Sequence, residues 1–328
     1  MKFSLKRRIA LVGLAAVAST PVSMTAFAQG FPNKPIKLVV PFAPGGPTDT
    51  FARIFGQALA ESLGQSVIVE NRPGAGGDIG TNYVAKSPAD GYTIGIGVNG
   101  PLAANQQLMG NQPFDPVKDF TPISLLFQAP NTLVVRPDYP AKSLSELLAM
   151  MRANPGKISY GTGGIGTSGH FSGELLKSLA KVDINAIPYK GDGPAMIDVL
   201  GGTLPMAFLS VGTTAGQIKA GNLRALAVTS TQRVGLFPDV PTMQEAGLKG
   251  YEITAWYGLI APAGLPADVT QRLNTATIQI MNSQKIQAKI LSMGGLVSTT
   301  TPKAFHDFIV AEIPKWAKLA KESGIKLN

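Results

Sequence analysis

Short apolar runs alternate with amphipathic segments along most of the chain. The runs at 36–42, 66–70 and 92–98 have the length and composition of buried strands, and 48–63 and 77–86 between them have helical spacing. A second series has strand candidates at 157–160, 184–189, 206–211 and 224–229, and helix candidates at 168–179, 194–200 and 213–220. This alternation predicts largely parallel sheets covered by helices on both faces, so we expect an α/β fold.

Two further apolar stretches connect these series. Stretch 123–137 contains Pro130, and we expect a long strand, broken at that proline, to carry the chain from one domain to the next. Stretch 253–262 precedes three helical segments at 267–281, 285–293 and 302–323, which the simplest arrangement returns to the first domain. Two crossings form a hinge that lets two lobes close on a ligand. The predicted lobes are 29–127 with 257–328, and 128–256.

The N-terminus has the pattern of a secretory signal peptide at 1–28. Four basic residues precede an apolar run at 9–18, and Ala26 and Ala28 place small side chains where a signal peptidase reads. We therefore expect cleavage before Gln29 and a periplasmic product. The run is too short to cross a ~30 Å hydrocarbon core, which takes about 20 helical residues, so a membrane anchor is the weaker interpretation. The Arg7-Arg8 pair leaves twin-arginine export open, although the residues after it match that motif poorly.

Composition narrows the class of protein. About 300 residues remain after the leader, which favours two domains. The net charge of +9 falls to +5 without the four basic residues of the leader, and the remaining Lys and Arg residues are scattered, so a nucleic-acid surface is poorly supported. A mildly positive field helps to attract a small anion. There is no cysteine, which excludes disulfides, thiolate catalysis and Cys-based metal sites.

Two glycine-rich segments occupy equivalent places between a strand and a helix. We call them turn 1 (41–49, PFAPGGPTD) and turn 2 (160–168, YGTGGIGTS). Ligands of open α/β sheets bind beyond the carboxyl ends of the strands. Glycines allow close backbone approach there, and helix N-termini offer unpaired N–H groups and partial positive charge. Either segment alone is better interpreted as an ordinary capped loop, but the matched pair favours an anion site. Thr48, Asp49, Thr167 and Ser168 also suit helix caps and first turns.

Other motifs argue against a nucleotide site and against an enzyme. Segment 161–166 matches GxGxxG, but the next strand lacks an acidic residue at its end, because Asp183 lies at its start. The sequence has no GxSxG, HExxH or P-loop. The only histidines are His170, interpreted as a first-turn residue facing solvent or the cleft, and His306, a surface residue. We expect no catalytic residue, metal or cofactor. Arg72, in a third glycine-rich segment, is a weak candidate for a ligand contact.

Nine segments in order resemble the Bug family, the periplasmic receptors of tripartite tricarboxylate transporters. They are VPFAPGGPTD (40–49), VENRPGAGGDIG (69–80), DGYTIGIG (90–97), PNTLVVRPDYP (130–140), YGTGGIGTSGH (160–170), IPYKGDGPAMIDVLGG (187–202), AGNLRALAVTS (220–230), FPDVPTMQEAG (237–247) and WYGLIAPAGLP (256–266). Together they cover the chain nearly end to end after the leader.

The resemblance implies a two-lobed periplasmic-binding-protein fold, type II-like, with two crossover strands and a ligand cleft between the lobes. It implies a solute-binding protein, not an enzyme, that captures a small carboxylate with backbone groups and ordered waters. The residues it carries over are Phe42, Ala43, Pro44, Gly45, Gly46, Asp49, Thr162, Gly163, Thr167 and Ser168. The interpretation of the turns adds Thr48 and Gly166. The implied partners are a large and a small integral membrane subunit, and we expect a monomer.

One departure from the family pattern concerns the ligand. Pro205 and Leu209 stand where the family usually has acidic residues, so a carboxylate for a ligand's ammonium group is missing from that segment. This mildly favours a plain di- or tricarboxylate or an aromatic acid over an amino acid. Two alternatives stay open: a ligand sensor that feeds a membrane signalling protein, and, less well supported because of the scarcity of histidine, an exported hydrolase.

Overall fold

The computed structural model describes residues 30–45, 47–106, 110–189 and 191–323. The predicted signal peptide and its cleavage site lie outside these residues. The strands are β1 (Ile36–Val40), β2 (Val67–Asn71), β3 (Thr93–Val98), β4 (Phe120–Val135), β5 (Ser159–Thr162), β6 (Asn185–Pro188), β7 (Met206–Ser210), β8 (Arg224–Val228), β9 (Thr254–Pro262) and β10 (Leu296–Val297). The α-helices are α1 (Pro47–Leu63), α2 (Asp78–Ala85), α4 (Leu144–Ala153), α5 (Ser168–Ala180), α6 (Asp192–Gly201), α7 (Val211–Lys219), α8 (Ala267–Met281), α9 (Gln284–Ser292) and α10 (Pro302–Ser323). Two short helical segments, η1 (Ala75–Gly77) and η2 (Gly100–Ala104), complete the elements.

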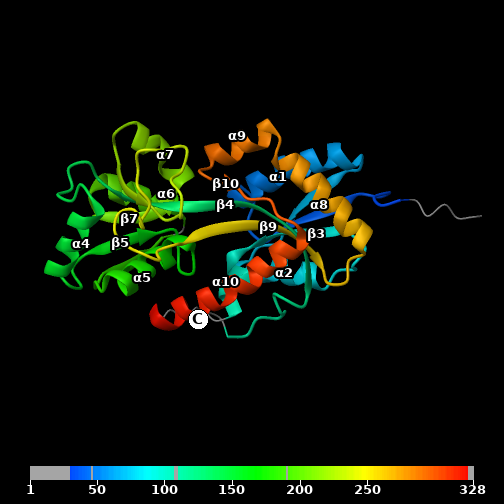
Figure 1. The fold of residues 1–328 in the computed structure, drawn as a ribbon, viewed down its shortest axis with the longest axis horizontal. Coiled ribbons are helices and arrows are strands. Elements are labelled where there is room, and N and C mark those ends of the chain that lie inside the picture. Colours follow the sequence, from blue (N-terminus) through cyan, green and yellow to red (C-terminus); the bar gives the residue numbers. More distant parts are fainter. Residues whose placement is uncertain (1–29, 46, 107–109, 190, 324–328) are drawn as a thin grey trace, which may run out of the picture. The chain divides into compact units, whose positions relative to one another are not determined.

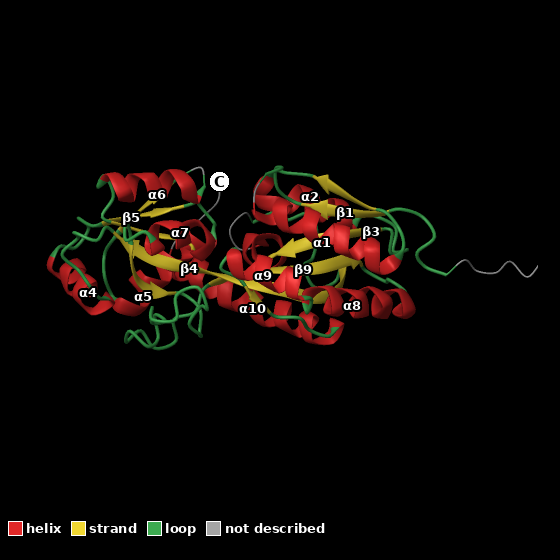
Figure 2. Ribbon diagram, turned by 90° about the horizontal axis from the view of Figure 1, so that it is seen from above, coloured by secondary structure: helices red, strands yellow, loops and turns green. Residues whose placement is uncertain are grey.

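The strands form two sheets that share β4. In sheet A, β1 pairs in parallel with β2 and β3, and β9 lies antiparallel between β3 and the first part of β4. In sheet B, β5 pairs in parallel with β6 and β7, and the second part of β4 pairs antiparallel with β7 and β8. Figure 1 shows β4 and β9 running side by side, and Figure 2 shows α4 to α7 around the strands of sheet B. The expected α/β fold with two crossing strands is therefore confirmed.

The first crossing strand is not broken at Pro130. Strand β4 continues through this residue for 16 residues in all. Its partners change there instead: Pro130 is opposite Thr254 of β9 in sheet A, and Asn131 is opposite Ser210 of β7 in sheet B. A proline cannot donate to a ladder of hydrogen bonds, and here its missing N–H coincides with the change of sheet.

The two crossings are tied together by Thr229, which follows β8. The Asn131 N–H donates to Thr229 Oγ1 at 2.8 Å, and the Thr229 N–H donates to the Asn131 carbonyl at 3.0 Å. The Ile253 N–H donates to the Thr229 carbonyl at 3.1 Å. Three segments far apart in the sequence are thus held by backbone hydrogen bonds at the point where the chain passes between the sheets.

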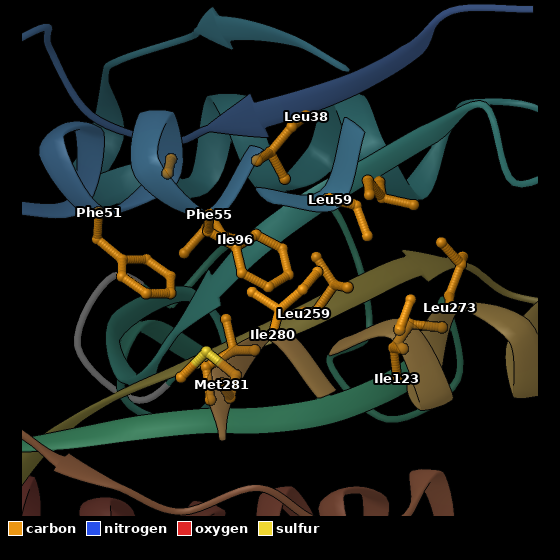
Figure 3. Packing of buried hydrophobic residues seen from close by; sticks show 14 of the residues in the cluster. Leu38, Phe51, Phe55, Leu59, Ile96, Ile123, Leu259, Leu273, Ile280 and Met281 are labelled. Atoms are coloured by element: carbon orange, nitrogen blue, oxygen red, sulfur yellow. The ribbon is translucent and has the colours of Figure 1, made fainter. Parts of the chain in front are cut away.

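Each sheet has its own buried apolar cluster. Helices α1 and α8 pack on sheet A, where Phe51, Phe55 and Leu273 point toward strand residues such as Leu259 (Figure 3). Under sheet B, residues of β4, β5 and β7 pack with α4 and α5. The C-terminal helices α8 and α10 both contact β4, the strand that the two sheets share.

Helix α10 contacts both β4, which the two sheets share, and α5, which packs under sheet B. The indole N–H groups of Trp256 in β9 and Trp316 in α10 both donate to Glu312 Oε2, at 3.0 and 2.8 Å. Trp316 also packs edge-on against Phe171 of α5, with ring centroids 4.6 Å apart. Helix α10 therefore connects the second crossing strand to the helix that follows turn 2.

Candidate functional site

Turn 1 connects β1 to α1 and exposes its backbone. Ala43, Pro44 and Gly45 are exposed, Phe42 is half-buried against the core, and Gly45 has a φ of +87° that favours glycine. Gly46 lies outside the described residues. Thr48 and Asp49 are both buried in the first turn of α1. First-turn N–H groups have no partner within a helix, so they are available to an anion.

Asp49 supports turn 1 from inside. Its Oδ2 accepts from the Gly45 N–H at 2.9 Å and from Arg53 Nε at 3.0 Å. Its Oδ1 accepts from Asn71 Nδ2 at 2.9 Å and from Arg53 Nη2 at 2.9 Å. Asn71 Nδ2 also donates to the Phe42 carbonyl at 3.0 Å. These bonds, with Arg53 the largest cause, lower the pKa of Asp49 to about 2. Both carboxylate oxygens are engaged within the protein, so we interpret Asp49 as a residue that positions the turn.

Turn 2 connects β5 to α5, and a set of neutral groups holds it. Thr167 is the N-cap of α5: its Oγ1 accepts from the His170 N–H at 3.3 Å and donates to the Gly164 carbonyl at 2.8 Å. The Thr162 and Thr167 hydroxyl oxygens are 3.0 Å apart. The predicted cap at Thr167 is therefore confirmed. The N–H groups of Ser168 and Gly169 in the first turn remain for a ligand.

His170 is buried and supports turn 2, so the expectation that it faces solvent is wrong, whereas its predicted place in the first turn of a helix is confirmed. Only 7% of its surface is exposed, and Nδ1 accepts from the Gly166 N–H at 3.1 Å. Burial lowers the pKa of His170, the nearby charge of Lys177 lowers it further, and that of Glu174 opposes this. Gly166, with a φ of +76°, brings its N–H to the imidazole. Ser168 Oγ instead lies 3.5 Å from Asn131 Oδ1 of β4. The neutral imidazole of His170 therefore acts as a hydrogen-bond acceptor for the backbone of turn 2.

Tyr257 on the second crossing strand links the surroundings of the two turns. Its ring stacks on Phe127, with centroids 4.3 Å apart and planes at 9°. Burial raises the pKa of the Tyr257 hydroxyl, a hydrogen bond with Thr48 lowers it, and the negative charge of Asp192 raises it. Tyr257 is thus in contact with the start of α1 and within electrostatic range of the start of α6. The sequence analysis included this tyrosine only as part of segment 256–266 and did not name it as a site residue.

Asp192 is a second residue that the sequence analysis missed. Helix α6 was expected at 194–200 but begins at Asp192, so this residue was not recognised as part of a helix start. Its carboxylate lies against Gly163 of turn 2, where a Cβ atom would collide with Oδ1. The Gly191 N–H donates to the Gly163 carbonyl at 2.9 Å. A side chain at position 163 would therefore have to displace the carboxylate of Asp192.

The alternatives weighed for other motifs find little support among the described residues. Arg72 pairs with Glu70 through Nη2 at 2.5 Å and stacks on Tyr83 at 3.5 Å, whereas its buried Nε has no hydrogen-bond partner among the described residues. The described part of the chain contains no group of three acidic, histidine or cysteine side chains that could bind a metal. Within that part, no helix is long and apolar enough to cross a bilayer.

Comparison with known proteins identifies relatives over nearly the whole chain. Residues 51–325 match the family model of the tripartite tricarboxylate transporter family receptor, TctC. The chain is 36% identical to protein BugT of Bordetella pertussis over 326 residues, which cover 99% of this chain and all of BugT.

Solved structures show the same fold. R. palustris Rpa4515, solved with adipate, is 36% identical with a TM-score of 0.80, over 90% of this chain and 99% of that one. MatC from Rhodopseudomonas palustris, solved with bound malate, is 33% identical with a TM-score of 0.75, over 88% of this chain and 99% of that one. A third, the periplasmic binding protein BugD, is 38% identical with a TM-score of 0.76, over 90% and 99% of the two chains.

Proposed function

Because this chain belongs to the tripartite tricarboxylate transporter receptor family, we propose that it captures a small carboxylate and delivers it to a membrane transporter of that type. It is a solute-binding receptor and not an enzyme. Two relatives that share its fold at more than 30% identity were solved with adipate and with malate, which are both dicarboxylates. These ligands support a carboxylate as the ligand of this chain.

The observation that carries the proposal is the matched construction of the two turns. Each follows a parallel strand, each precedes a helix, and each leaves first-turn N–H groups without a partner in the helix. The Gly45 N–H donates to Asp49 and the Gly166 N–H donates to His170, so these two groups are not open to a ligand. The amides left for a ligand are those at the two helix starts, near Thr48 and Ser168. Donors of this kind bind a carboxylate through hydrogen bonds and the helix dipole.

The finer parts of the proposal concern partners and processing. The membrane partners are a large and a small integral subunit, and the receptor is monomeric. The leader at 1–28 is removed before Gln29, which releases the mature chain into the periplasm. The lobes are 29–127 with 257–328, and 128–256, with the ligand between them. Intact-mass measurement of a periplasmic extract tests the cleavage, and a full-length product in the membrane pellet contradicts it.

Ligand binding is expected to close the lobes about the Asn131–Thr229–Ile253 connection. Trp256 and Trp316 are both buried and both donate to Glu312 Oε2, so the two indoles differ in their other neighbours. Trp316 contacts Phe171, one turn beyond Ser168 in α5, so we expect it to carry most of a ligand-induced fluorescence change. Substituting Trp316→Phe should remove that change, whereas Trp256→Phe should leave most of it.

A thermal-shift screen tests carboxylate binding directly. Citrate, malate, adipate, aromatic carboxylates and amino acids are added to the mature protein, and the best hit is repeated as its neutral amide. A ligand at 100 times its Kd stabilises the folded state by about 2.7 kcal/mol. This raises the Tm by several degrees, at roughly 2–4 °C per kcal/mol for somewhat smaller proteins. An amide that binds as well as the acid contradicts a carboxylate site.

A further inference from the structure

The carboxylate of Asp192 has one anchored oxygen and one open oxygen. Oδ2 accepts from the Ser210 N–H at 2.8 Å and lies 3.4 Å from Thr213 Oγ1, which fixes the side chain against the start of α7. Oδ1 lies against Gly163 of turn 2. No described residue donates a hydrogen bond to Oδ1. Among the described residues, the fixed carboxylate therefore keeps one oxygen without a donor beside a turn that is proposed to bind the ligand.

The charge of Asp192 also acts on the other side of the proposed site. The charge of Asp192 raises the pKa of the Tyr257 hydroxyl, and Thr48 at the start of α1 lowers the pKa of the same group. Asp192 thus lies close to turn 2 and within electrostatic range of a group bonded to turn 1. A ligand bound by both helix starts therefore lies where the charge of Asp192 acts on it.

A fixed negative charge has a definite effect on the choice of ligand. A second carboxylate within a few ångströms of Asp192 is repelled, because two like charges at short range disfavour each other's ionised form. A donor, by contrast, forms a charge-assisted hydrogen bond, which is about twice as strong as one between neutral groups. An ammonium group gains both the hydrogen bond and the charge attraction.

We propose that Asp192 is a specificity-determining residue, whose Oδ1 accepts a hydrogen bond from an ammonium group carried by the carboxylate ligand. This inference rests on the proposed function and narrows its ligand to an amino-substituted carboxylate. It reverses the expectation drawn from Pro205 and Leu209, because the acidic group missing from that segment is supplied by the start of α6.

The substitution Asp192→Asn separates this role from a structural one. An asparagine side-chain oxygen accepts from the Ser210 N–H as the carboxylate does, so the connection between α6 and α7 is kept while the charge is removed. Asp183→Asn is the matched control: it makes the same change of charge on an exposed residue just before β6, at the opposite end of that strand from turn 2.

The experiment measures the Kd values of two pairs of probes by calorimetry on the mature protein. Succinate and aspartate share one skeleton and differ by an ammonium group at one carbon. Adipate and 6-aminohexanoate have similar length, with an ammonium in place of one carboxylate. In the wild type we expect the amino-bearing member of at least one pair to bind about tenfold more tightly, or about 1.4 kcal/mol. In Asp192→Asn this ratio should fall to near one, and in Asp183→Asn it should stay.

Two results overturn the inference. One is a wild type that binds the plain member of both pairs as well as or better than the amino-bearing member, a result that needs no folded variant. The other is a folded Asp192→Asn protein, verified by circular dichroism, that keeps the wild-type ratio. If succinate or adipate binds without such a preference, the carboxylate-binding function stands and only the role of Asp192 is wrong. If the wild type binds none of the four probes and nothing in the broader carboxylate screen, the proposed function itself fails.

Discussion

Turn 1 and turn 2 occupy the same place in two βα units, yet they are supported by different chemistry. Turn 1 is held by a buried carboxylate: Asp49, 3% exposed, bonds Gly45, Arg53 and Asn71. Turn 2 is held by neutral groups, namely the Thr167 hydroxyl and the imidazole of His170. In both, a side chain from the first turn of the following helix reaches back to an N–H of the turn.

The helices that follow the two turns, α1 and α5, also pack differently. At turn 2, α5 lies directly on the backbone of β7, and a Cβ on Gly169 would be 2.5 Å from the Phe208 carbonyl oxygen. At turn 1, the larger Thr50 and Phe51 follow Asp49, and the ring of Phe51 packs on Phe127. Two βα turns with the same topology are thus held in place by different kinds of contact. The two turns should therefore fail under different changes.

The largest effect is expected for turn 1, from Asp49→Ala. This change leaves the Gly45 N–H, Arg53 and Asn71 without their shared acceptor. Hydrogen bonds to a charged group contribute roughly 1.5–3 kcal/mol each, so the free energy of unfolding should fall by about 3 kcal/mol in urea denaturation. Asp138→Ala removes a carboxylate from an exposed pair with Arg136 and should change stability by about 0.5 kcal/mol or less. Equal losses in the two variants would show that Asp49 does not support turn 1.

A smaller effect is expected for turn 2, from Gly169→Ala. The added methyl group meets the backbone of β7, which cannot move as a side chain can, and overpacking of this kind costs typically 1–3 kcal/mol. We expect a loss of about 2 kcal/mol in thermal unfolding. Gly193→Ala is the control, because a Cβ there has no neighbour within 4 Å. The same substitution in that open helical position should be neutral or stabilising by up to about 1 kcal/mol. Similar stability of both variants contradicts the close approach.

The smallest effect is expected from pH, and it distinguishes the two turns. Burial keeps the pKa of His170 below 6.5, so its contribution to stability is complete above pH 6.5 and is lost as the pH falls below that value toward the folded-state pKa. The pKa of Asp49 is lowered from 3.8 to about 2, so its contribution is complete above pH 3.8 and is lost as the pH falls toward 2. Mild acid should therefore weaken turn 2 and spare turn 1.

The measurement is the stability of the wild type minus that of His170→Asn, followed from pH 8 to pH 4.5. An asparagine places a neutral acceptor near the position of Nδ1 and does not titrate in this range. The difference should decrease in acid, with Glu174 and Lys177 as the charged neighbours that modulate it. A difference that does not change with pH would exclude His170 as the acid-sensitive support.

The amino-acid sequence by itself determined the class of the fold, the position of both turns and the family. Strand and helix periodicity, the N-cap at Thr167 and the glycines are encoded within a few residues, and nine segments in order identify the relatives. Because these signals depend on neighbouring residues only, they do not predict features that depend on distant partners. The break expected at Pro130 did not occur, because a change of sheet absorbs the missing N–H.

Only the tertiary structure decided what surrounds the turns. His170 is buried because α5 packs against its neighbours, and Asp192 reaches Gly163 because α6 begins beside turn 2, 29 positions further along the chain. Tyr257 lies on the crossing strand β9, 94 positions beyond Gly163, where the charge of Asp192 acts on its hydroxyl. Contacts between residues so far apart depend on how separate βα units pack, and no spacing along the chain records that packing.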